Sequence, residues 1–331
     1  MIKLSNKTVR QHYVPQFYLK GFANTNGSKY YLFTYNKENN TIFPTNIKNI
    51  AQENYFYDID EAQTIEKQFA QFEGMFNKAL QKLIVTEDLN KLYPEEKEVL
   101  SHFIAIQFLR TKETRIFNKN VVENLIDFIG KHNIPNFKEG ITSITEDSLK
   151  EFHIEFILNN FIYFSNIMFD EMYWMLCVNY TDTPFWISDN PCAIYNELKT
   201  DPFYSNLGLR CKGFQLHFPL SSKLLLILIN TNFYTSDLYK VKKTGDKVFN
   251  EEILENERIL EMCKRVNMPI VDLLPEKEFV DKNRVTFENN LQIISSTQFI
   301  FSKNDNFKLA EKYLSEYPHY KYRNRKRISV D

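Results

Sequence analysis

The chain has few of the residues that carry the most easily recognised catalytic motifs. Its 331 residues include only 8 glycines and 4 cysteines. No glycine-rich phosphate loop, no Gly-x-Ser-x-Gly elbow and no His-Glu-x-x-His pair occurs in it. These absences argue against P-loop NTPases, α/β-hydrolases and zincin proteases, and they leave room for an unfamiliar hydrolase.

Cysteine pairs and long apolar runs are also missing. The cysteines Cys177, Cys192, Cys211 and Cys263 form no Cys-x-x-Cys pair and match no zinc ribbon or finger. The first residues lack the apolar core of a signal peptide, and no run approaches the roughly 18 apolar residues that span a bilayer. We therefore expect a cytoplasmic protein with reduced thiols and no membrane partner.

What the chain does contain is typical of a folded globular protein. Hydrophobic residues make up 43% and charged residues 25%, and the formal net charge is −1. With this charge, the molecule as a whole neither attracts nor repels nucleic acid. We expect a single α+β domain over 1–331, with a mainly helical part at 1–172, a sheet with helices at 173–301 and a basic tail at 302–331.

One short stretch near the start, residues 11–23, organises our interpretation. Pro15 is typical of the first residue of a helix, and Gly21 indicates where that helix ends. His12 then lies in an extended segment just before the helix N-terminus, close to Gln16. Such a short helix needs packing against the rest of the fold, so it would hold these polar groups at a fixed point.

Hydrophobic periodicity predicts the remaining elements. The period of 3.6 predicts helices over 64–85, 94–132, 145–164, 250–266 and 279–301. Alternation predicts strands over 29–35, 41–46, 55–58, 173–180, 185–188, 192–195, 214–218, 224–229 and 271–274. We expect hairpins from 29–46 and from 173–188. The fold class is α+β: a helical N-terminal half with a small hairpin, then an antiparallel sheet with packed helices.

Four sequence blocks resemble a known family. They are HYVPQFYLKGFA at 12–23, AIQFLRT at 105–111, FWISDNP at 185–191 and FPLSSK at 218–223. In this order they are similar to the bacterial family called domain of unknown function 4238, over most of the chain to about residue 260. The chain departs from the family in having Ile before the SDNP serine and Ser-Ser after Pro219-Leu220. The resemblance implies no settled activity.

The SDNP run combines a hydroxyl, a carboxylate and an amide after an apolar strand. Ser188, Asp189 and Asn190 stand where Pro191 stops the strand ladder. Asp189 could be a base, a metal ligand or the partner of a histidine. The alternative is a turn in which Asp189 or Asn190 bonds nearby backbone N–H groups. The resemblance marks this run together with His12.

Gln107 and Arg110 lie three residues apart, so they share one face of a helix. Their neighbours are apolar, and a guanidinium buried there needs an anionic partner. Asp189 and a substrate phosphate are both candidates. The alternative is a structural pair between this arginine and an acid, fastening helix to sheet.

His217 is a second histidine of interest, on the same strand face as Gln215. A lone histidine there is more often a satisfied structural group than a ligand. A metal site from His12, His217 and Asp189 is conceivable, although no ligand spacing supports it. The sequence does not identify a cofactor, and a divalent metal is compatible with it.

The C-terminal segment is basic, with Arg323, Arg325 and Lys326 among its positive charges and tyrosines just upstream. Basic and aromatic residues suit phosphate contact and base stacking, so nucleic acid is a possible partner. A solvated tail without a partner is the alternative.

We therefore predict one composite site that joins the opening stretch to the SDNP turn. Its catalytic residues would be His12, Asp189 and Arg110, and its substrate-binding residues Gln16, Gln107, Ser188 and Asn190 with the basic tail. The expected function is hydrolysis of a phosphate-containing substrate by a nuclease-like effector, with bacterial antiviral defence as its expected setting. The alternative is a non-enzymatic binding or structural protein in which the same residues lock helices onto the sheet.

Overall fold

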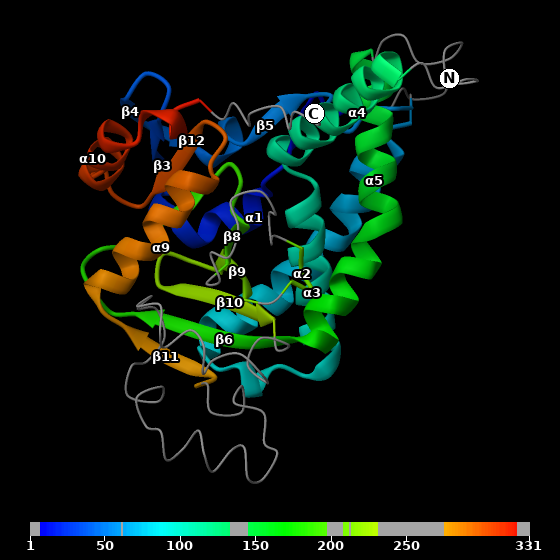
Figure 1. Ribbon diagram of the computed structural model, residues 1–331. Helices are drawn as coiled ribbons and strands as arrows, with labels where there is room; N and C mark the ends of the chain where they lie inside the picture. Colours follow the sequence, from blue (N-terminus) through cyan, green and yellow to red (C-terminus); the bar gives the residue numbers. More distant parts are fainter. Residues whose placement is uncertain are drawn as a thin grey trace, which may run out of the picture.

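The computed structural model (Figure 1) describes residues 7–60, 62–132, 145–196, 208–211, 213–230 and 275–322. Helices α2 (Thr64–Thr86), α3 (Pro94–Leu109) and α5 (Glu146–Asn166) stand on one side of a central sheet, and α9 (Lys282–Ser295) lies on the other side. The opening stretch, with α1 (Gln16–Leu19), runs between these two groups. Segments from both halves of the chain therefore meet around the opening stretch.

The N-terminal segment consists of short elements. They are β1 (Arg10–His12), α1 (Gln16–Leu19), the 3-10 turn η1 (Lys20–Phe22), β2 (Asn24–Asn26), β3 (Lys29–Asn36), β4 (Thr41–Asn46), the 3-10 turn η2 (Ile47–Asn49) and β5 (Gln52–Asn54). Pro15 caps α1 in an extended conformation, and the predicted β3–β4 hairpin is confirmed. The predicted strand at 55–58 is wrong, because Tyr55 has a φ of 54° and begins a turn after β5.

Gly21 does not end the helix as predicted, because η1 continues through it to Phe22. Its role is close packing. A Cβ at this position would lie 2.9 Å from the carbonyl oxygen of Leu220, and Ser222 donates its N–H to the Gly21 oxygen at 3.1 Å. The glycine therefore lets α1 and η1 contact the turn that follows β9 (Phe214–Pro219).

The helical part follows. Its elements are α2 (Thr64–Thr86), the 3-10 turn η3 (Leu89–Lys91), α3 (Pro94–Leu109), α4 (Lys112–His132), α5 (Glu146–Asn166) and the π-helical turn η4 (Ile167–Glu171). Pro94 occupies the first turn of α3. Thr145 caps α5 by accepting the N–H of Ser148, at the residue where the predicted helix over 145–164 begins.

The predicted single helix over 94–132 is wrong, because it breaks at Arg110. Arg110 caps α3 with a φ of −91° and a ψ of 1°. The Thr111 hydroxyl then accepts the N–H of Thr114 at 3.3 Å and starts α4. Local capping by a threonine thus outweighs a continuous helical pattern.

The central sheet has the strand order β11-β6-β10-β9-β8. Its strands are β6 (Met172–Asn179), β8 (Ala193–Asn196), β9 (Phe214–Pro219), β10 (Leu224–Asn230) and β11 (Lys277–Val280). β11 is parallel to β6, and the other pairs are antiparallel. The predicted hairpin of 173–180 with 185–188 is wrong, since β6 pairs with β10 and β11.

Each face of this sheet has its own covering. Leu176, Leu226 and Phe218 belong to the same apolar cluster as residues of α2 and α3. Alternation turns His217 to the opposite face, where it contacts Glu288 of α9 (Lys282–Ser295).

A second sheet brings the two ends of the chain together. Its order is β2-β3-β12-β7, with β4 paired to β3. β7 (Ile187–Ser188) precedes the SDNP turn, and β12 (Phe299–Ser302) pairs with both β3 and β7. The helix predicted over 279–301 is therefore replaced in part by β11 and β12. The predicted helix at 250–266 and strand at 271–274 lie outside the described residues.

The segment predicted as a tail begins with ordered structure. α10 (Lys308–Glu316) and the 3-10 turn η7 (Pro318–Tyr320) follow β12. Ala310 and Leu314 of α10 are buried in a cluster with Tyr35 and Trp186. The first half of this segment thus packs on the second sheet.

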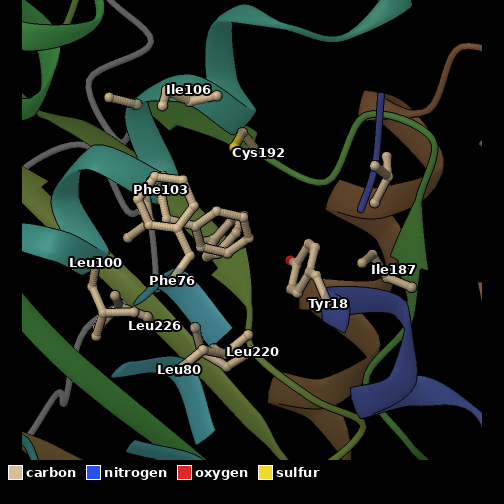
Figure 2. Packing of buried hydrophobic residues seen from close by; sticks show 14 of the residues in the cluster. Tyr18, Phe76, Leu80, Leu100, Phe103, Ile106, Ile187, Cys192, Leu220 and Leu226 are labelled. Atoms are coloured by element: carbon tan, nitrogen blue, oxygen red, sulfur yellow. The ribbon is translucent and has the colours of Figure 1, made fainter. Parts of the chain in front are cut away.

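Aromatic side chains fill the centre of the main core (Figure 2). Phe103 of α3 lies beside Phe76 of α2, with ring centroids 5.5 Å apart. Tyr18 of α1 stacks on Phe218 at 5.0 Å, and its hydroxyl donates to the carbonyl oxygen of Pro219. The opening helix is therefore packed against the rest of the fold, which so short a helix needs in order to be stable.

The α+β fold class is confirmed, including the helical N-terminal half. In the part of the chain that the structure describes, no helix combines the length and apolar character that a bilayer span requires.

Candidate functional site

The opening stretch joins the fold through β1, which pairs antiparallel with β5. Gln11 is buried, and its side-chain oxygen accepts the N–H of Tyr57 at 2.6 Å. Its side-chain nitrogen donates to the Asp58 carboxylate at 2.5 Å. These bonds use both ends of the amide and fix the turn at 55–58 against β1.

His12, the last residue of β1, is half-buried. Its Nε2 lies 3.3 Å from the carbonyl oxygen of Ile47. Burial lowers the pKa of His12 to about 4; the contact with Ile47 opposes this shift and the charge of Arg110 adds to it. The imidazole is therefore neutral at pH 7 and a weak base, so it suits hydrogen bonding better than proton transfer.

Gln107 and Arg110 share one face at the end of α3, as predicted. Arg110 donates from Nε to the Tyr13 carbonyl oxygen at 3.1 Å and to the Gln107 side-chain oxygen at 3.2 Å. Gln107 donates to the same carbonyl at 3.0 Å. Both side chains are buried, and Arg110 is only 3% exposed. The two residues thus clamp the backbone of the opening stretch to α3.

The guanidinium of Arg110 is incompletely satisfied. Its Nη2 is buried without a hydrogen-bond partner. Within the described residues, no carboxylate forms an ion pair with it. Its Cζ lies 5.6 Å from the ring centroid of Phe69. A buried charge with an unused donor is costly, so this atom is a candidate for contact with a bound anion.

Two acidic residues of α2 lie near Arg110 without pairing with it. Glu66 and Glu73 are half-buried, two helical turns apart. Burial raises the pKa of Glu66 to about 7, against the charge of Arg110, and the negative charge of Glu73 adds to this rise. Burial likewise raises the pKa of Glu73. With a pKa of about 7, the carboxyl group of Glu66 is suited to acid–base catalysis.

Three buried donor groups lie around the turn at 55–58: burial raises the pKa of Tyr57, and the nearby charges of Arg110 and Arg115 both oppose this rise. We call them the donor cluster: the Nη2 of Arg110, the hydroxyl of Tyr57 and the Nε of Arg115. None of these atoms has a hydrogen-bond partner in the part of the chain that the structure describes. Tyr57 is 1% exposed, and Arg115 is half-buried.

Aromatic rings hold the donor cluster together. The Tyr57 ring lies 4.8 Å from that of Phe56 and 5.1 Å from that of Phe69. Arg115 stacks on Phe56, with its Cζ 3.6 Å from the ring centroid, and donates from Nη2 to the Phe56 carbonyl oxygen at 2.7 Å. Arg110 thus lies over the ring of Phe69 and Arg115 over that of Phe56, and Tyr57 contacts both rings.

The SDNP turn has a different character, because its polar groups are already bonded. The Ser188 hydroxyl donates to Gln292 of α9 at 2.8 Å. The Asn190 amide donates to the backbone and side-chain oxygens of Ser295 at 3.0 and 3.1 Å. Gln292 also donates to the Pro191 carbonyl oxygen at 2.9 Å. We call this set, together with Asp189, the SDNP seam.

Asp189 caps the turn between α9 and β12. One carboxylate oxygen accepts the N–H of Thr297 at 2.7 Å, and the other accepts those of Gln298 and Phe299 at 2.8 and 2.9 Å. Asp189 is buried, which raises its pKa, while these N–H groups and the charge of Lys37 oppose the shift. Both oxygens are occupied, which favours the structural alternative for this residue.

Tyr13 connects the two regions. Its carbonyl oxygen accepts the bonds from Gln107 and Arg110, whereas its ring lies 5.3 Å from that of Phe56. Burial raises the pKa of Tyr13, and the negative charge of Asp189 adds to this rise. Among the described residues, no hydrogen bond or ion pair joins His12 to Asp189, so the composite site stays a prediction.

His217 belongs to a separate buried network. Its Nδ1 lies 2.8 Å from a Glu288 oxygen, and its Nε2 lies 3.1 Å from the Gln215 side-chain oxygen. Arg284 lies 2.8 Å from the other Glu288 oxygen. Burial opposes the ionisation of Glu288, but the positive groups beside it lower its pKa overall. His217 is thus a satisfied group between the sheet and α9.

The other predicted site residues are quickly placed. Gln16 begins α1, is half-buried and makes no hydrogen bond to a described residue through its side chain. Arg323, Arg325 and Lys326 lie outside the described residues. No group of three or more His, Cys, Asp or Glu side chains is arranged to hold a metal ion in the described ranges.

Sequence reasoning missed Glu66, Glu73, Tyr57 and Arg115. One signal was present for the first two. They stand seven residues apart, beside the apolar positions Ile65 and Phe69, so they had to lie at the edge of the buried face of α2. No local pattern marks Tyr57 or Arg115, because their meeting depends on the turn after β5 and on the break between α3 and α4.

Comparison with known proteins gave one match. A family model described as "Protein of unknown function (DUF4238)" matches residues 10–306. No curated protein and no solved structure matches the chain.

Proposed function

The chain belongs to the DUF4238 family, as its four sequence blocks indicated, and we propose that it is a hydrolase acting on a phosphate-containing substrate. One observation carries the proposal. Arg110 is buried with an unused Nη2 donor, and the two nearby carboxyl groups of α2 do not pair with it. A positive group that is buried yet unpaired supports an anion as its missing partner.

The neighbouring groups supply the acid–base chemistry. Glu66, with a pKa of about 7, accepts a proton from water as the water oxygen bonds to phosphorus. The P–O ester bond breaks, and the leaving oxygen takes up the proton that Glu66 received, while the negative charge of Glu73 helps to keep the pKa of Glu66 raised. Arg110 stabilises the negative charge on the phosphoryl oxygens. His12 stays neutral and orients the substrate through a hydrogen bond.

A narrower proposal is a nuclease-like effector in the cytoplasm, with antiviral defence as its setting. The tyrosine-rich and basic segment around Arg323, Arg325 and Lys326 would attract nucleic acid. Three free cysteines, Cys177, Cys192 and Cys211, suit a reducing compartment. In this proposal Asp189 has a structural role: it holds the turn between α9 and β12 and takes no part in the chemistry.

The rival proposal is a non-enzymatic protein in which polar residues lock helices onto the sheet. The SDNP seam supports it, because the side chains of Ser188, Asp189 and Asn190 are already hydrogen-bonded to α9 and to the turn before β12. Such a network specifies a fold without any chemistry.

A hydrolysis assay separates the two proposals. Purified protein is incubated with small phosphate monoesters and with labelled RNA and DNA, with and without Mg²⁺ or Mn²⁺. Released phosphate and cleaved oligonucleotides are measured for the wild type and for Glu66→Gln and Glu73→Gln. Glu155→Gln on α5, an exposed acid, serves as the matched control.

We expect turnover by the wild type and the control, and at least about a 100-fold lower rate for Glu66→Gln, the usual loss on removing a general base. Absence of turnover under every condition, or equal rates for Glu66→Gln and the control, would support the structural protein instead.

A further inference from the structure

We propose that the donor cluster binds a terminal phosphate group, that is, a phosphate monoester and not an internal phosphodiester. The inference rests on the proposed function for the identity of the anion and deepens it by naming the substrate class. It is carried by Tyr57 and Arg115, which the reaction outlined above does not use.

The first argument is the number of unused donors. Arg110 Nη2, the Tyr57 hydroxyl and Arg115 Nε are buried donors without a partner. Protein interiors rarely leave such groups unpaired, since each costs about 1–3 kcal/mol. A terminal phosphate offers three free oxygens, one for each donor. An internal phosphodiester has only two, because its other two oxygens are esterified.

The second argument is the position of the donors. The hydroxyl of Tyr57 belongs to a side chain that is 1% exposed, and its ring lies between those of Phe56 and Phe69. An internal phosphodiester needs space for a chain on two sides of the phosphorus. A terminal phosphate needs it on only one, so it fits buried donors better.

The third argument is charge. Arg110 and Arg115 bring two positive charges to the aromatic rings, at Cζ–centroid distances of 5.6 and 3.6 Å. A phosphate monoester carries a charge of about −1.5 to −2 at pH 7, whereas an internal phosphodiester carries −1. Two guanidinium groups with one neutral hydroxyl therefore match the monoester better.

Isothermal titration with inorganic phosphate tests this assignment on the full chain. Tyr57→Phe removes a hydroxyl without a partner, so the fold should tolerate it, and Arg115→Met removes the second guanidinium. Arg210→Met is the control, because Arg210 pairs with Glu171 and is exposed. Thermal unfolding of each variant verifies that it is folded.

We expect Tyr57→Phe to weaken phosphate binding about fivefold and Arg115→Met about 30-fold, as for lost neutral and charge-assisted hydrogen bonds. The control should bind as the wild type does. If wild type does not bind phosphate, or if folded Tyr57→Phe and Arg115→Met both bind it as tightly as the control, the donors interact with water only and the inference is overturned.

A competition experiment distinguishes the two phosphate classes. In the Glu66→Gln background, a short oligonucleotide with a 5′-phosphate should displace inorganic phosphate, and the same oligonucleotide with a 5′-hydroxyl should not. Equal displacement by both would place an internal phosphodiester on the donors and overturn the inference. Because this readout is binding, it stays informative even if the protein hydrolyses nothing, which would contradict the proposed function alone.

Discussion

The SDNP seam and the donor cluster are both buried and polar, yet they differ in how far their hydrogen bonds are satisfied. In the seam, Asp189 alone accepts three backbone N–H groups. In the cluster, three donors on Arg110, Tyr57 and Arg115 have no partner. A satisfied network holds a fold together, whereas buried unsatisfied donors are rare in native proteins and call for an explanation such as a bound ligand or water. The cluster is therefore the better place to look for function.

The largest expected effect comes from breaking the seam. Asp189→Asn replaces one carboxylate oxygen by an NH2 group, which faces backbone N–H donors and leaves at least one of them unpaired. We expect a loss of about 3 kcal/mol in the free energy of unfolding, as for a buried charge-assisted bond. Urea unfolding measures it. Asp305→Asn, an exposed acid beyond β12, is the control, and equal stability of the two variants would contradict the structural role of Asp189.

An intermediate effect is expected from a matched pair of tyrosines. Tyr18 and Tyr57 are both fully buried, but only the Tyr18 hydroxyl has a partner, the carbonyl oxygen of Pro219. Tyr18→Phe should cost about 1 kcal/mol, whereas Tyr57→Phe should be neutral or slightly stabilising. Thermal or urea unfolding of both variants checks this difference. A larger loss for Tyr57→Phe would mean that its hydroxyl is bonded in the ligand-free protein.

The smallest effect concerns pH. The pKa of Glu66 is raised from 4.5 to about 7, so the folded protein binds more protons than the unfolded chain between these values. The contribution of Glu66 to stability is thus complete below pH 4.5 and is lost as pH rises through 7. Glu66→Gln lacks this loss, so its stability relative to the wild type should increase from pH 5 to pH 8.

The control for this titration is Glu155→Gln, whose stability difference from the wild type should stay nearly constant over the same range. His12 acts in the opposite direction: its pKa of about 4 makes the wild type less stable as pH falls from 6.5 to 4. The two variants should therefore be compared with the wild type at each pH. A pH-independent difference for Glu66→Gln would show that Glu66 titrates normally.

Much of the fold could be predicted from the sequence, because local patterns decide local structure. The β3–β4 hairpin, α2, the Thr145 cap of α5 and the strands β9 and β10 follow from periodicity and turn residues. Strand pairing was harder. β7 pairs with β12 and not with β6, since partners are chosen by packing between distant segments that no local signal reports.

The candidate site was predictable only in part, for the same reason. His12, Gln107 and Arg110 were found because polar residues stood out in apolar surroundings. Asp189 stood out equally, but its partners are backbone N–H groups more than 100 positions away, which side-chain patterns do not reveal. In the predicted helix over 94–132, Arg115 had no distinguishing feature. Its position became clear only when the structure showed that this helix breaks at Arg110 and that Arg115 belongs to a separate helix, α4.

The pairing of β3 with β12 has a consequence for synthesis of the protein. Lys37, which follows β3, bonds to Ser296 just before β12, 259 positions later. A ribosome adding about 5–20 residues per second releases the hairpin many seconds before its partner strand exists. During that interval, Phe33 and Tyr35 belong to an unpaired strand edge, which favours aggregation. A nascent chain stalled before residue 299 should therefore depend on chaperones more than the full chain does.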